Sequence, residues 1–527
     1  MKFIKKVKRF KRNVNKVKKE SGWNYIKTIN EMKKARNNGI SFSTYRKNKC
    51  YKMTEEELQK FKEKLEKKNK NLEKCIEMIC NETGWDKDRA NNEIKSAKKM
   101  GISLSQYCNR ACYDLNSQEL NEMADIIRKQ KEKLNNDKQF YINAVVKKSG
   151  WNKEKVISEM EKADEMGINY LKYVQKGCWR KNEKELDDMV RFVKANTERI
   201  NKNKTTYIDK ICENTGWSKG KAHLEVNKAK INCGASYEDY YVFKLYDVSH
   251  EKQKEYVTLD LFNKMRIKYN DFFKASEIFD DKAKFNETFS DLINRKWFVN
   301  RNISYEEFLE KIKDLDNVLV KPLAATQGIG IKKFKCNESD KKNKELYETL
   351  INMDISIVEE YIIQHKDVMK FCPTSVNTLR ITTLNYNGEC KFLYSVFRMG
   401  RGEVVDNFHA GGIAATVDIK TGKVCTDAAD LEANVYPKNP YSNIKIKGFK
   451  IPNWDKIIET CQKASGKVEG VNLIGWDFAI TENGVDLIEG NPGASYVVAQ
   501  IPNIKDRKGL RKEMVDPYLT KEEIGYE

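Results

Sequence analysis

Three oxygen-bearing side chains near the C-terminus have the types and the spacing of a metal site. An apolar segment carries Asp477, a turn follows at Gly484, and a second apolar segment ends in Glu489-Gly-Asn491. This pattern predicts a β-hairpin that brings the three side chains to one end. Carboxylate and amide oxygens suit Mg²⁺, which leaves its other positions to water and phosphate. The sequence therefore predicts that Asp477, Glu489 and Asn491 bind the metal of a nucleotide.

A phosphate-binding loop is predicted upstream of this hairpin. Residues 318–332 read as a buried strand that ends at Lys321, a loop that contains Gly328 and Gly330, and another strand. Glycines let backbone N–H groups close on phosphate oxygens, and a lysine beside them adds a point charge. A plain hairpin turn is the alternative interpretation of the same residues.

The next strands carry charged residues among apolar neighbours. An apolar segment ends at Glu359 and Glu360, which could meet an adenine and its ribose or serve only the structure. Arg380 and Arg398 follow on two further strands. An arginine on a half-buried strand is usually paired with an acid or with a phosphate. His409, in a Gly-rich turn, is read either as a structural histidine or as a catalyst.

The order of these blocks resembles the ATP-grasp superfamily, and most closely its sugar-transfer-associated branch. The resemblance covers about residues 235–515. It is carried by these segments: Lys321-Pro, Gln364-His365, Ser375-Val-Asn377-Thr-Leu-Arg380, Val405-Asp406-Asn407, Gly411-Gly412-Ile413, Gly475-Trp-Asp477 and Leu487-Ile-Glu489-Gly-Asn491.

The resemblance implies a two-lobed α+β fold that holds ATP between antiparallel sheets, and it assigns roles to residues. Nucleotide binding falls to Lys282, Lys321, Gly328, Gly330, Glu359, Glu360, Tyr361, Ile362 and Asn407, and Mg²⁺ binding to Asp477, Glu489 and Asn491. Arg380 and Arg398 would stabilise the transferring phosphoryl group or an acyl phosphate, because phosphoryl transfer depends mostly on positioning and positive charge.

Two departures from the family pattern stand out. Ala324-Ala325 occupies a place where similar proteins often have glycine, and two methyl groups stiffen the loop. In addition, helical repeats stand where many family ligases carry an α/β substrate domain, so the substrate is not defined by analogy.

The N-terminal half is predicted to be an array of helical repeats. Its four anchors, Ser21-Gly-Trp23, Thr83-Gly-Trp85, Ser149-Gly-Trp151 and Thr215-Gly-Trp217, place the tryptophans 62, 66 and 66 residues apart. A fixed period of this kind is typical of stacked supersecondary units. Each unit reads as three helices, and the third helix is predicted to begin at Thr54, Asn116, Asn182 or Ser249. Glu57, Glu119 and Glu185 complete capping boxes, whereas Lys252 breaks the fourth.

Charge is concentrated at the N-terminus. The net charge is +21, and residues 1–50 hold 17 Lys/Arg against 2 Asp/Glu. A basic arm of this kind predicts contact with an anionic membrane surface or another polyanion, although a solvated face in a lysine-rich protein is the alternative. Nucleic acid is disfavoured, because repeats two to four are nearly charge-balanced.

The remaining features favour a cytoplasmic protein. No apolar run approaches the ~20 residues of a membrane-spanning helix, and the N-terminus lacks the apolar region of a secretory signal. The 13 cysteines are scattered and lack zinc-site spacing, which argues for a reducing compartment. Contact with the inner face of the membrane is left open.

We therefore expect a basic arm at 1–20, four helical repeats at 21–254 (about 21–82, 83–148, 149–214 and 215–254), an ATP-grasp domain at 255–515 and a tail at 516–527. The expected function is Mg-ATP-dependent joining of a carboxylate to an amine through an acyl phosphate, in cell-surface polysaccharide biosynthesis. The alternatives are a non-catalytic nucleotide-binding protein whose repeats recruit a polymer, a membrane surface or nucleic acid, and an ATP-dependent kinase.

Overall fold

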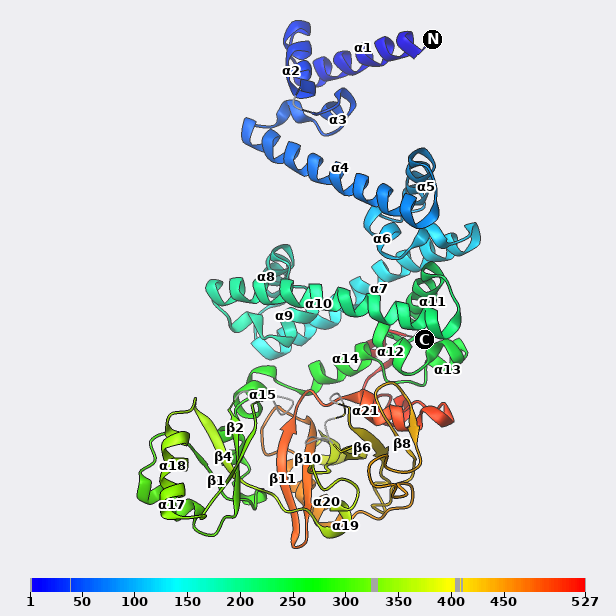
Figure 1. Ribbon diagram of the computed structural model, residues 1–527. Helices are drawn as coiled ribbons and strands as arrows, with labels where there is room; N and C mark the ends of the chain where they lie inside the picture. Colours follow the sequence, from blue (N-terminus) through cyan, green and yellow to red (C-terminus); the bar gives the residue numbers. More distant parts are fainter. Residues whose placement is uncertain (1, 38, 324–329, 403–407, 409–410, 527) are drawn as a thin grey trace. The chain divides into compact units, whose positions relative to one another are not determined.

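The structure, a computed structural model, describes residues 2–37, 39–323, 330–402, 408 and 411–526. The chain forms two compact units, one that ends at Ala124 and one that begins at Asp125, and the division falls within helix α7 (Ser117–Ser149) (Figure 1). Among the described residues, no helix combines the length and the apolar character needed to cross a membrane.

The first unit is entirely helical. It contains α1 (Lys2–Ser21), α2 (Tyr25–Asn37), α3 (Phe42–Lys47), α4 (Glu55–Thr83), α5 (Lys87–Lys99), α6 (Leu104–Asn109), and the 3₁₀ helices η1 (Cys50–Lys52) and η2 (Cys112–Asp114). Val14 and Val17 of α1 are fully buried in one cluster with Met32 of α2. The basic N-terminal segment is therefore a helix that packs on the first repeat along its C-terminal half.

The second unit continues the helical succession before the strands begin. Its first helices are α8 (Lys153–Met166), α9 (Tyr170–Gln175), η3 (Cys178–Arg180), α10 (Glu183–Thr215), α11 (Lys219–Cys233), α12 (Tyr237–Val242), η4 (Leu245–Asp247) and α13 (His250–Gln253). The predicted capping boxes are present at Thr54, Asn116 and Asn182, and Ser249 lacks one. One feature was not predicted: a left-handed residue precedes each of the 3₁₀ helices η1 to η4, and these residues are Lys49, Ala111, Gly177 and Lys244.

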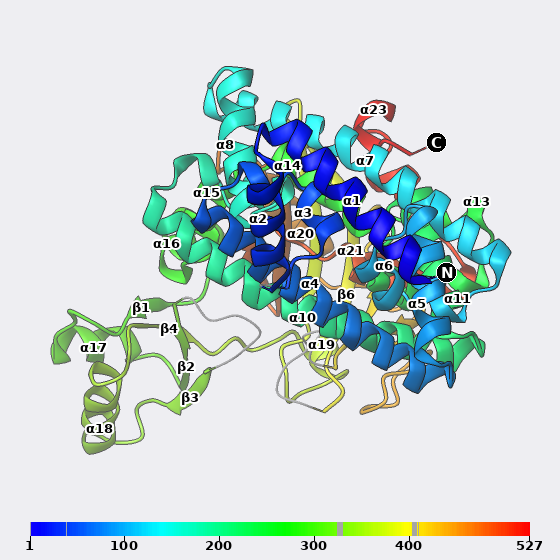
Figure 2. The same ribbon diagram turned by 90° about the horizontal axis from the view of Figure 1, so that it is seen from above.

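Two antiparallel sheets form the C-terminal part, and in two perpendicular views they lie beside each other (Figure 1, Figure 2). The four-stranded sheet has the order β1-β4-β2-β3, and the seven-stranded sheet the order β11-β10-β5-β6-β7-β8-β9. Their strands are β1 (Trp297–Val299), β2 (Asn317–Pro322), β3 (Lys332–Lys335), β4 (Ser356–Glu360), β5 (Leu379–Tyr386), β6 (Glu389–Met399), β7 (Ile413–Thr416), β8 (Ala428–Ala429), β9 (Val435–Tyr436), β10 (Leu473–Thr481) and β11 (Gly484–Asn491). This α+β arrangement confirms the predicted fold class.

Helices connect and cover the two sheets. They are α14 (Leu259–Tyr269), α15 (Phe272–Phe279), α16 (Lys282–Thr288), η5 (Ser290–Leu292), α17 (Tyr305–Ile312), α18 (Asp340–Ile351), α19 (Lys366–Met369), α20 (Trp454–Ala464), α21 (Tyr496–Gln500), η7 (Ile501–Asp506), α22 (Arg511–Met514) and α23 (Lys521–Ile524). Helices α17 and α18 share a core with the four-stranded sheet.

The seven-stranded sheet is buried on both faces. Val396 and Ala414 belong to one core, whereas the next residues along the same strands, Phe397 and Ala415, belong to the other. This alternation follows from the two-residue period of a strand. By the same period, Arg380, Arg398 and Asp477 fall on the face of the first core.

The fourth repeat is part of that first core. Its Tyr240 and Phe243 lie in one buried cluster with Leu473 and Tyr496. Buried Asp239 of the repeat accepts a hydrogen bond of 2.6 Å from the Tyr496 hydroxyl. The predicted domain border at 254/255 therefore runs through continuous packing.

Candidate functional site

The predicted hairpin forms, and its register brings the predicted metal ligands together. Asp477 of β10 lies opposite Glu489 of β11, and Gly475 lies opposite Asn491. A bulge between Asp477 and Phe478 interrupts the pairing directly after the acid. Because paired residues of antiparallel strands point to the same face, the two carboxylates are neighbours.

Two arginines bind Asp477 from adjacent strands. Asp477 also lies opposite Arg380 of β5, whose Nη2 donates to Asp477 Oδ2 at 2.6 Å and whose Nε donates to Oδ1. Arg398 Nη2 is 3.1 Å from the same Oδ2. These two cations lower the pKa of the buried Asp477 carboxyl to about 2, against the effect of desolvation. The two predicted catalytic arginines are thus present, and both contact a predicted metal ligand.

Glu489 has the opposite electrostatic environment. Desolvation, the charge of Asp477 and a hydrogen bond with Asp477 raise its pKa to about 7. Its side chain nevertheless retains 52% of its exposure. A divalent cation beside Glu489 would favour the ionised form of this carboxyl and so oppose the rise in its pKa.

The predicted lysines lie on the other sheet and on the helix beside it. Lys282 Nζ donates to the carbonyl oxygens of Pro322 and Leu323, at 3.1 and 3.2 Å. Desolvation lowers the pKa of Lys282, while the charge of Glu489 opposes that effect and the charge of Lys321 adds to it. Lys282 therefore lies within electrostatic reach of both Lys321 and Glu489, so the predicted phosphate and metal groups converge from the two sheets.

The two glutamates predicted to meet the nucleotide have different surroundings. Glu359 is buried, and its Oε2 lies 2.5 Å from Lys321 Nζ. Glu360 points to the other side of β4 and accepts a hydrogen bond of 2.9 Å from the backbone N–H of Lys296. Tyr361 follows, with Lys333 Nζ 3.6 Å from its ring centre. Of the two carboxylates, Glu360 is the more accessible.

The residue that joins the two sheets, Arg295, was not predicted. Buried Arg295 pairs with Glu359 of β4 at 2.8 Å and with Asp486 of β11 at 2.9 Å. It also donates to the carbonyl oxygen of Leu487 at 2.8 Å. The partners lie 64 and 191 residues away along the chain, so no local motif marks this arginine.

Several other predicted residues have positions that bear on the site. Gly330 is described, with a φ of +79° that favours glycine. Ile362 is partly buried directly after Tyr361. Ala324, Ala325, Gly328, Asp406, Asn407 and His409 lie outside the described residues, so their predicted roles stay predictions.

The donors that are present fit a magnesium nucleotide. Glu489 and Asn491 stand on the same face of β11 with Asp477 beside them, and they supply hard oxygen atoms. The described His, Cys, Asp and Glu residues contain no group of three placed to hold a metal alone. An amide and phosphate oxygens would therefore complete the ligand set.

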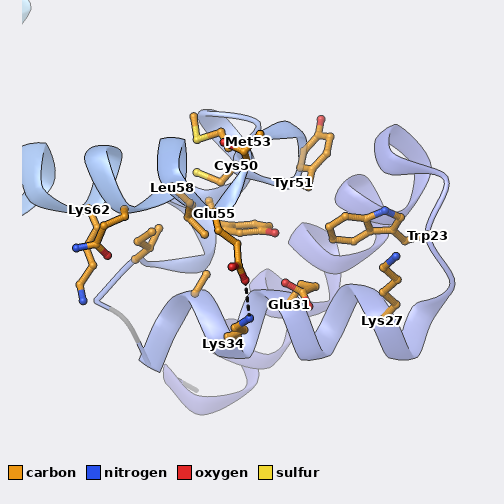
Figure 3. A pocket seen from close by; sticks show the side chains of 15 residues that line it. Trp23, Lys27, Glu31, Lys34, Cys50, Tyr51, Met53, Glu55, Leu58 and Lys62 are labelled. Carbon is orange, nitrogen blue, oxygen red and sulfur yellow. Dashed lines mark ion pairs between the residues drawn. The ribbon is translucent and has the colours of Figure 1, made fainter.

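A cavity is also present in the first unit, whose residues precede those of the sheets in the sequence. It has a volume of about 360 Å³ and is lined by Trp23, Tyr51 and Leu58 among others (Figure 3). An ion pair between Lys34 and Glu55, 3.5 Å long, lies across it. Lys27 Nζ is 5.1 Å from the ring centre of Trp23. Trp23, which was predicted to be a core residue, is therefore partly exposed to this cavity.

Two antiparallel sheets, with lysines on one and paired carboxylates and arginines on the other, define an ATP-grasp fold. Residues 264–516 match the family described as sugar-transfer associated ATP-grasp, which confirms the resemblance predicted from the sequence. No curated protein matches the sequence.

Several solved structures are similar to part of the chain. D-alanine–D-alanine ligase from Helicobacter pylori is 16% identical, with a TM-score of 0.28, over 47% of this chain and 63% of that one. N5-carboxyaminoimidazole synthetase from Staphylococcus aureus, complexed with ADP, is 13% identical with a TM-score of 0.27, over 44% and 52%. An L-amino acid ligase from Bacillus licheniformis is 13% identical with a TM-score of 0.28, over 46% and 48%. The chain thus spans less than two thirds of each of these proteins, and at this level none of them defines its activity.

Proposed function

We propose that the protein is a Mg-ATP-dependent ligase that joins a carboxylate to an amine. The observation that supports this most is the row of Glu489, Asp477 and Arg380 across three adjacent strands, with Arg398 on the next. This row combines oxygen donors for a metal with two cations on one face, next to Lys282 and Lys321.

The proposed reaction has two steps. A substrate carboxylate oxygen attacks the terminal phosphorus of ATP, the bond from that phosphorus to the bridging oxygen breaks, and ADP leaves. The amine then attacks the acyl carbon, phosphate leaves with the bond electrons, and the nitrogen loses a proton. Mg²⁺ supplies charge neutralisation when it is bound.

The residues of this chain would position and neutralise the reacting groups. Glu489 and Asn491 would hold the metal, while Arg380 and Arg398 would face the negative charge of the transferring group. Lys282 and Lys321 would bind phosphate oxygens. Glu360 and the backbone after it would meet the ribose and the adenine, and Glu359 would keep Lys321 in place through their ion pair.

The description of the matching family supports a role in the biosynthesis of cell-surface polysaccharide. The acceptor would then be an amino acid or an amino sugar, and the protein would act in the cytoplasm.

The test is ADP release with a panel of amino acids and amino sugars. We expect Glu489→Ala to abolish turnover, because it removes a metal ligand. Glu469→Ala is the matched control, since the Glu469 side chain is 97% exposed and pairs only weakly with Lys274. Full turnover by Glu489→Ala would show that Glu489 does not bind an essential metal and that the site is wrongly assigned.

One observation favours a second candidate, a nucleotide-binding protein without turnover. Both oxygens of Asp477 are bound by arginine, which leaves this carboxylate less available to a metal. Calorimetry with Mg-ATP distinguishes the two candidates. Binding without ADP release on any acceptor would favour the second, and phosphate retained on the acceptor by mass spectrometry would indicate a kinase.

A further inference from the structure

A group of cations lies where the third repeat meets the beginning of the ATP-grasp domain. Lys148 comes from the end of α7, Lys172 from α9 and Arg266 from α14. Helices α9 and α14 are in contact, because Gln175 Nε2 donates to Asn263 Oδ1 at 3.0 Å. Lys148 Nζ donates to the carbonyl oxygen of Asn270 at 2.5 Å.

Two of these cations, Lys148 and Arg266, lie beside one aromatic ring. Lys148 Nζ is 5.4 Å and the Arg266 guanidinium carbon 5.3 Å from the ring centre of Phe272. All three cationic side chains are half-buried. The group therefore lies in one small region that ligands can still reach.

The positive charge of this region is not balanced. Asp271 is the nearby acid, and Arg180 binds it with two hydrogen bonds of 3.3 and 3.0 Å. Within the described part of the chain, no carboxylate lies within ion-pair distance of Lys148, Lys172 or Arg266. Half-buried cations without an anionic partner are costly, and such groups are found where a ligand completes the balance.

The pKa values agree with this picture. Desolvation lowers the pKa of Lys148 to about 8, with Asp271 opposing the effect and Arg180 adding to it. Desolvation also lowers the pKa of Lys172, and the neighbouring charges of Lys176 and Arg266 lower it further.

The cations lie next to the proposed metal site. Arg266 Nε donates to the carbonyl oxygen of Pro492 at 3.3 Å, directly after Asn491. A β-carbon on Gly493 would lie 3.4 Å from Arg266 Nη2 and 3.7 Å from Asn491 Oδ1. Arg266 is thus separated from a predicted metal ligand by little more than the space of one small side chain.

We propose that Lys148, Lys172 and Arg266 form a binding site for an anionic group, a carboxylate or a phosphate ester, contributed by the end of the second repeat, the third repeat and α14. That this group belongs to the ligase substrate rests on the proposed function. The anion site itself does not. Its position assigns a role to the repeats. They bind one end of the substrate, and the other end of the substrate reaches Asn491.

The site is tested by calorimetry of the full chain with inorganic phosphate and, separately, with succinate, at constant ionic strength. The variants are Lys148→Gln and Lys172→Gln. The matched controls are Lys153→Gln and Lys184→Gln, which change exposed lysines of the third repeat. Since a hydrogen bond to a charged group is lost, we expect each variant to weaken binding roughly tenfold and the controls to keep it.

Gly493→Val provides an independent variant. Its side chain would enter the space between Arg266 and Asn491, and the backbone there does not require glycine. We expect weaker anion binding, with a melting temperature close to that of the wild type. The stronger of the two probes would show whether the site prefers phosphate or carboxylate.

Two results would overturn the proposal. One is equal binding by Lys148→Gln, Lys172→Gln and the wild type. The other is loss of phosphate binding in Lys321→Gln alone, which would place the anion in the nucleotide site. Binding of Mg-ATP, followed with a fluorescent nucleotide, is measured separately, so failure of the proposed function would be seen independently of the anion site.

Discussion

At the scale of single residues, the molecule depends on a few buried charges that are paired across long stretches of chain. Arg295 is the clearest case, because it neutralises Glu359 on one sheet and Asp486 on the other. Removal of one partner from a buried ion pair leaves an uncompensated charge, which costs more than the pair contributes when intact.

Arg295→Met should therefore destabilise the second unit strongly. We expect a loss of about 3–5 kcal/mol in the free energy of unfolding, because buried Asp486 loses its ion-pair partner and Glu359 loses one of its two ion pairs. Urea denaturation measures this difference. Lys296→Met is the control: its pair with Asp314 is 48% and 64% exposed, so a change within ~1 kcal/mol is expected. Similar losses for both variants would contradict the structure.

Acid stability should depend on Asp477. The pKa of its carboxyl is about 2 in the folded protein, against 3.8 ordinarily. Above pH ~4 the folded and the unfolded chain are both ionised, and the stabilisation is fully present. As the pH falls from ~4 towards ~2, the unfolded chain takes up a proton first, so about 2 kcal/mol is lost.

The measurement is urea denaturation of the wild type and Asp477→Asn between pH 2 and pH 6. The difference in stability between the two proteins should shrink as the pH falls through that window. A difference that is constant with pH would mean that Asp477 is not held ionised by Arg380 and Arg398.

At the scale of elements, predictions succeeded where the signal is local. The capping boxes at Thr54, Asn116 and Asn182 are short sequence patterns, and the structure contains them. The β10–β11 hairpin is also local, since one Gly turn joins its strands. By contrast, the pairing of β10 with β5 joins residues that are 97 positions apart. The contact between Asp477 and Arg380 therefore required the strand order of the sheet.

The left-handed residue before each of η1 to η4 was missed because glycine occupies only one of these four positions. Lys49 has a φ of 50° in an exposed position. A left-handed conformation costs ~1–2 kcal/mol for a residue with a β-carbon. Glycine avoids this cost, but its more flexible unfolded chain loses more entropy on folding, and this loss cancels part of the gain.

Lys49→Gly should consequently raise the stability of the first unit, by up to about 1 kcal/mol. Thermal unfolding detects the change. Lys95→Gly, at an exposed position inside α5, should do the reverse and lose about 1 kcal/mol. A loss in both variants would mean that the left-handed turn is not formed.

At the scale of the whole molecule, the sequence predicted a helical half and an ATP-grasp half, and the structure adds how the fourth repeat packs on the sheets. The predicted border at 254/255 followed a change of pattern, whereas the fourth repeat shares its core with β10 and α21. The compact units divide instead near Ala124. Core continuity depends on which apolar faces meet, and periodicity along the chain does not contain that information.

The membrane contact proposed for α1 belongs to this scale too. Arg9, Arg12, Lys16 and Lys19 are exposed and recur at helical spacing, opposite the buried Val14 and Val17. Deletion of residues 1–20 would also uncover the core of the first repeat, so substitution is the cleaner test.

Replacement of Arg12, Lys16 and Lys19 by glutamine should weaken adsorption to phosphatidylserine vesicles at low salt. With ~1 kcal/mol for each cation near the surface, the loss is on the order of 100-fold. Vesicle sedimentation measures it. Glutamine at Lys64, Lys67 and Lys68 of α4, which are exposed, is the control. An equal loss in the control would mean that adsorption depends on the net charge of the protein and not on α1.

The position of Arg295 also constrains movement between the two sheets. Separation at that point would leave Asp486 without its arginine and would leave Glu359 with Lys321, so we expect a motion of one sheet against the other to turn about the Arg295 guanidinium. The residues nearest to it would hardly shift, while those farthest from it would travel most.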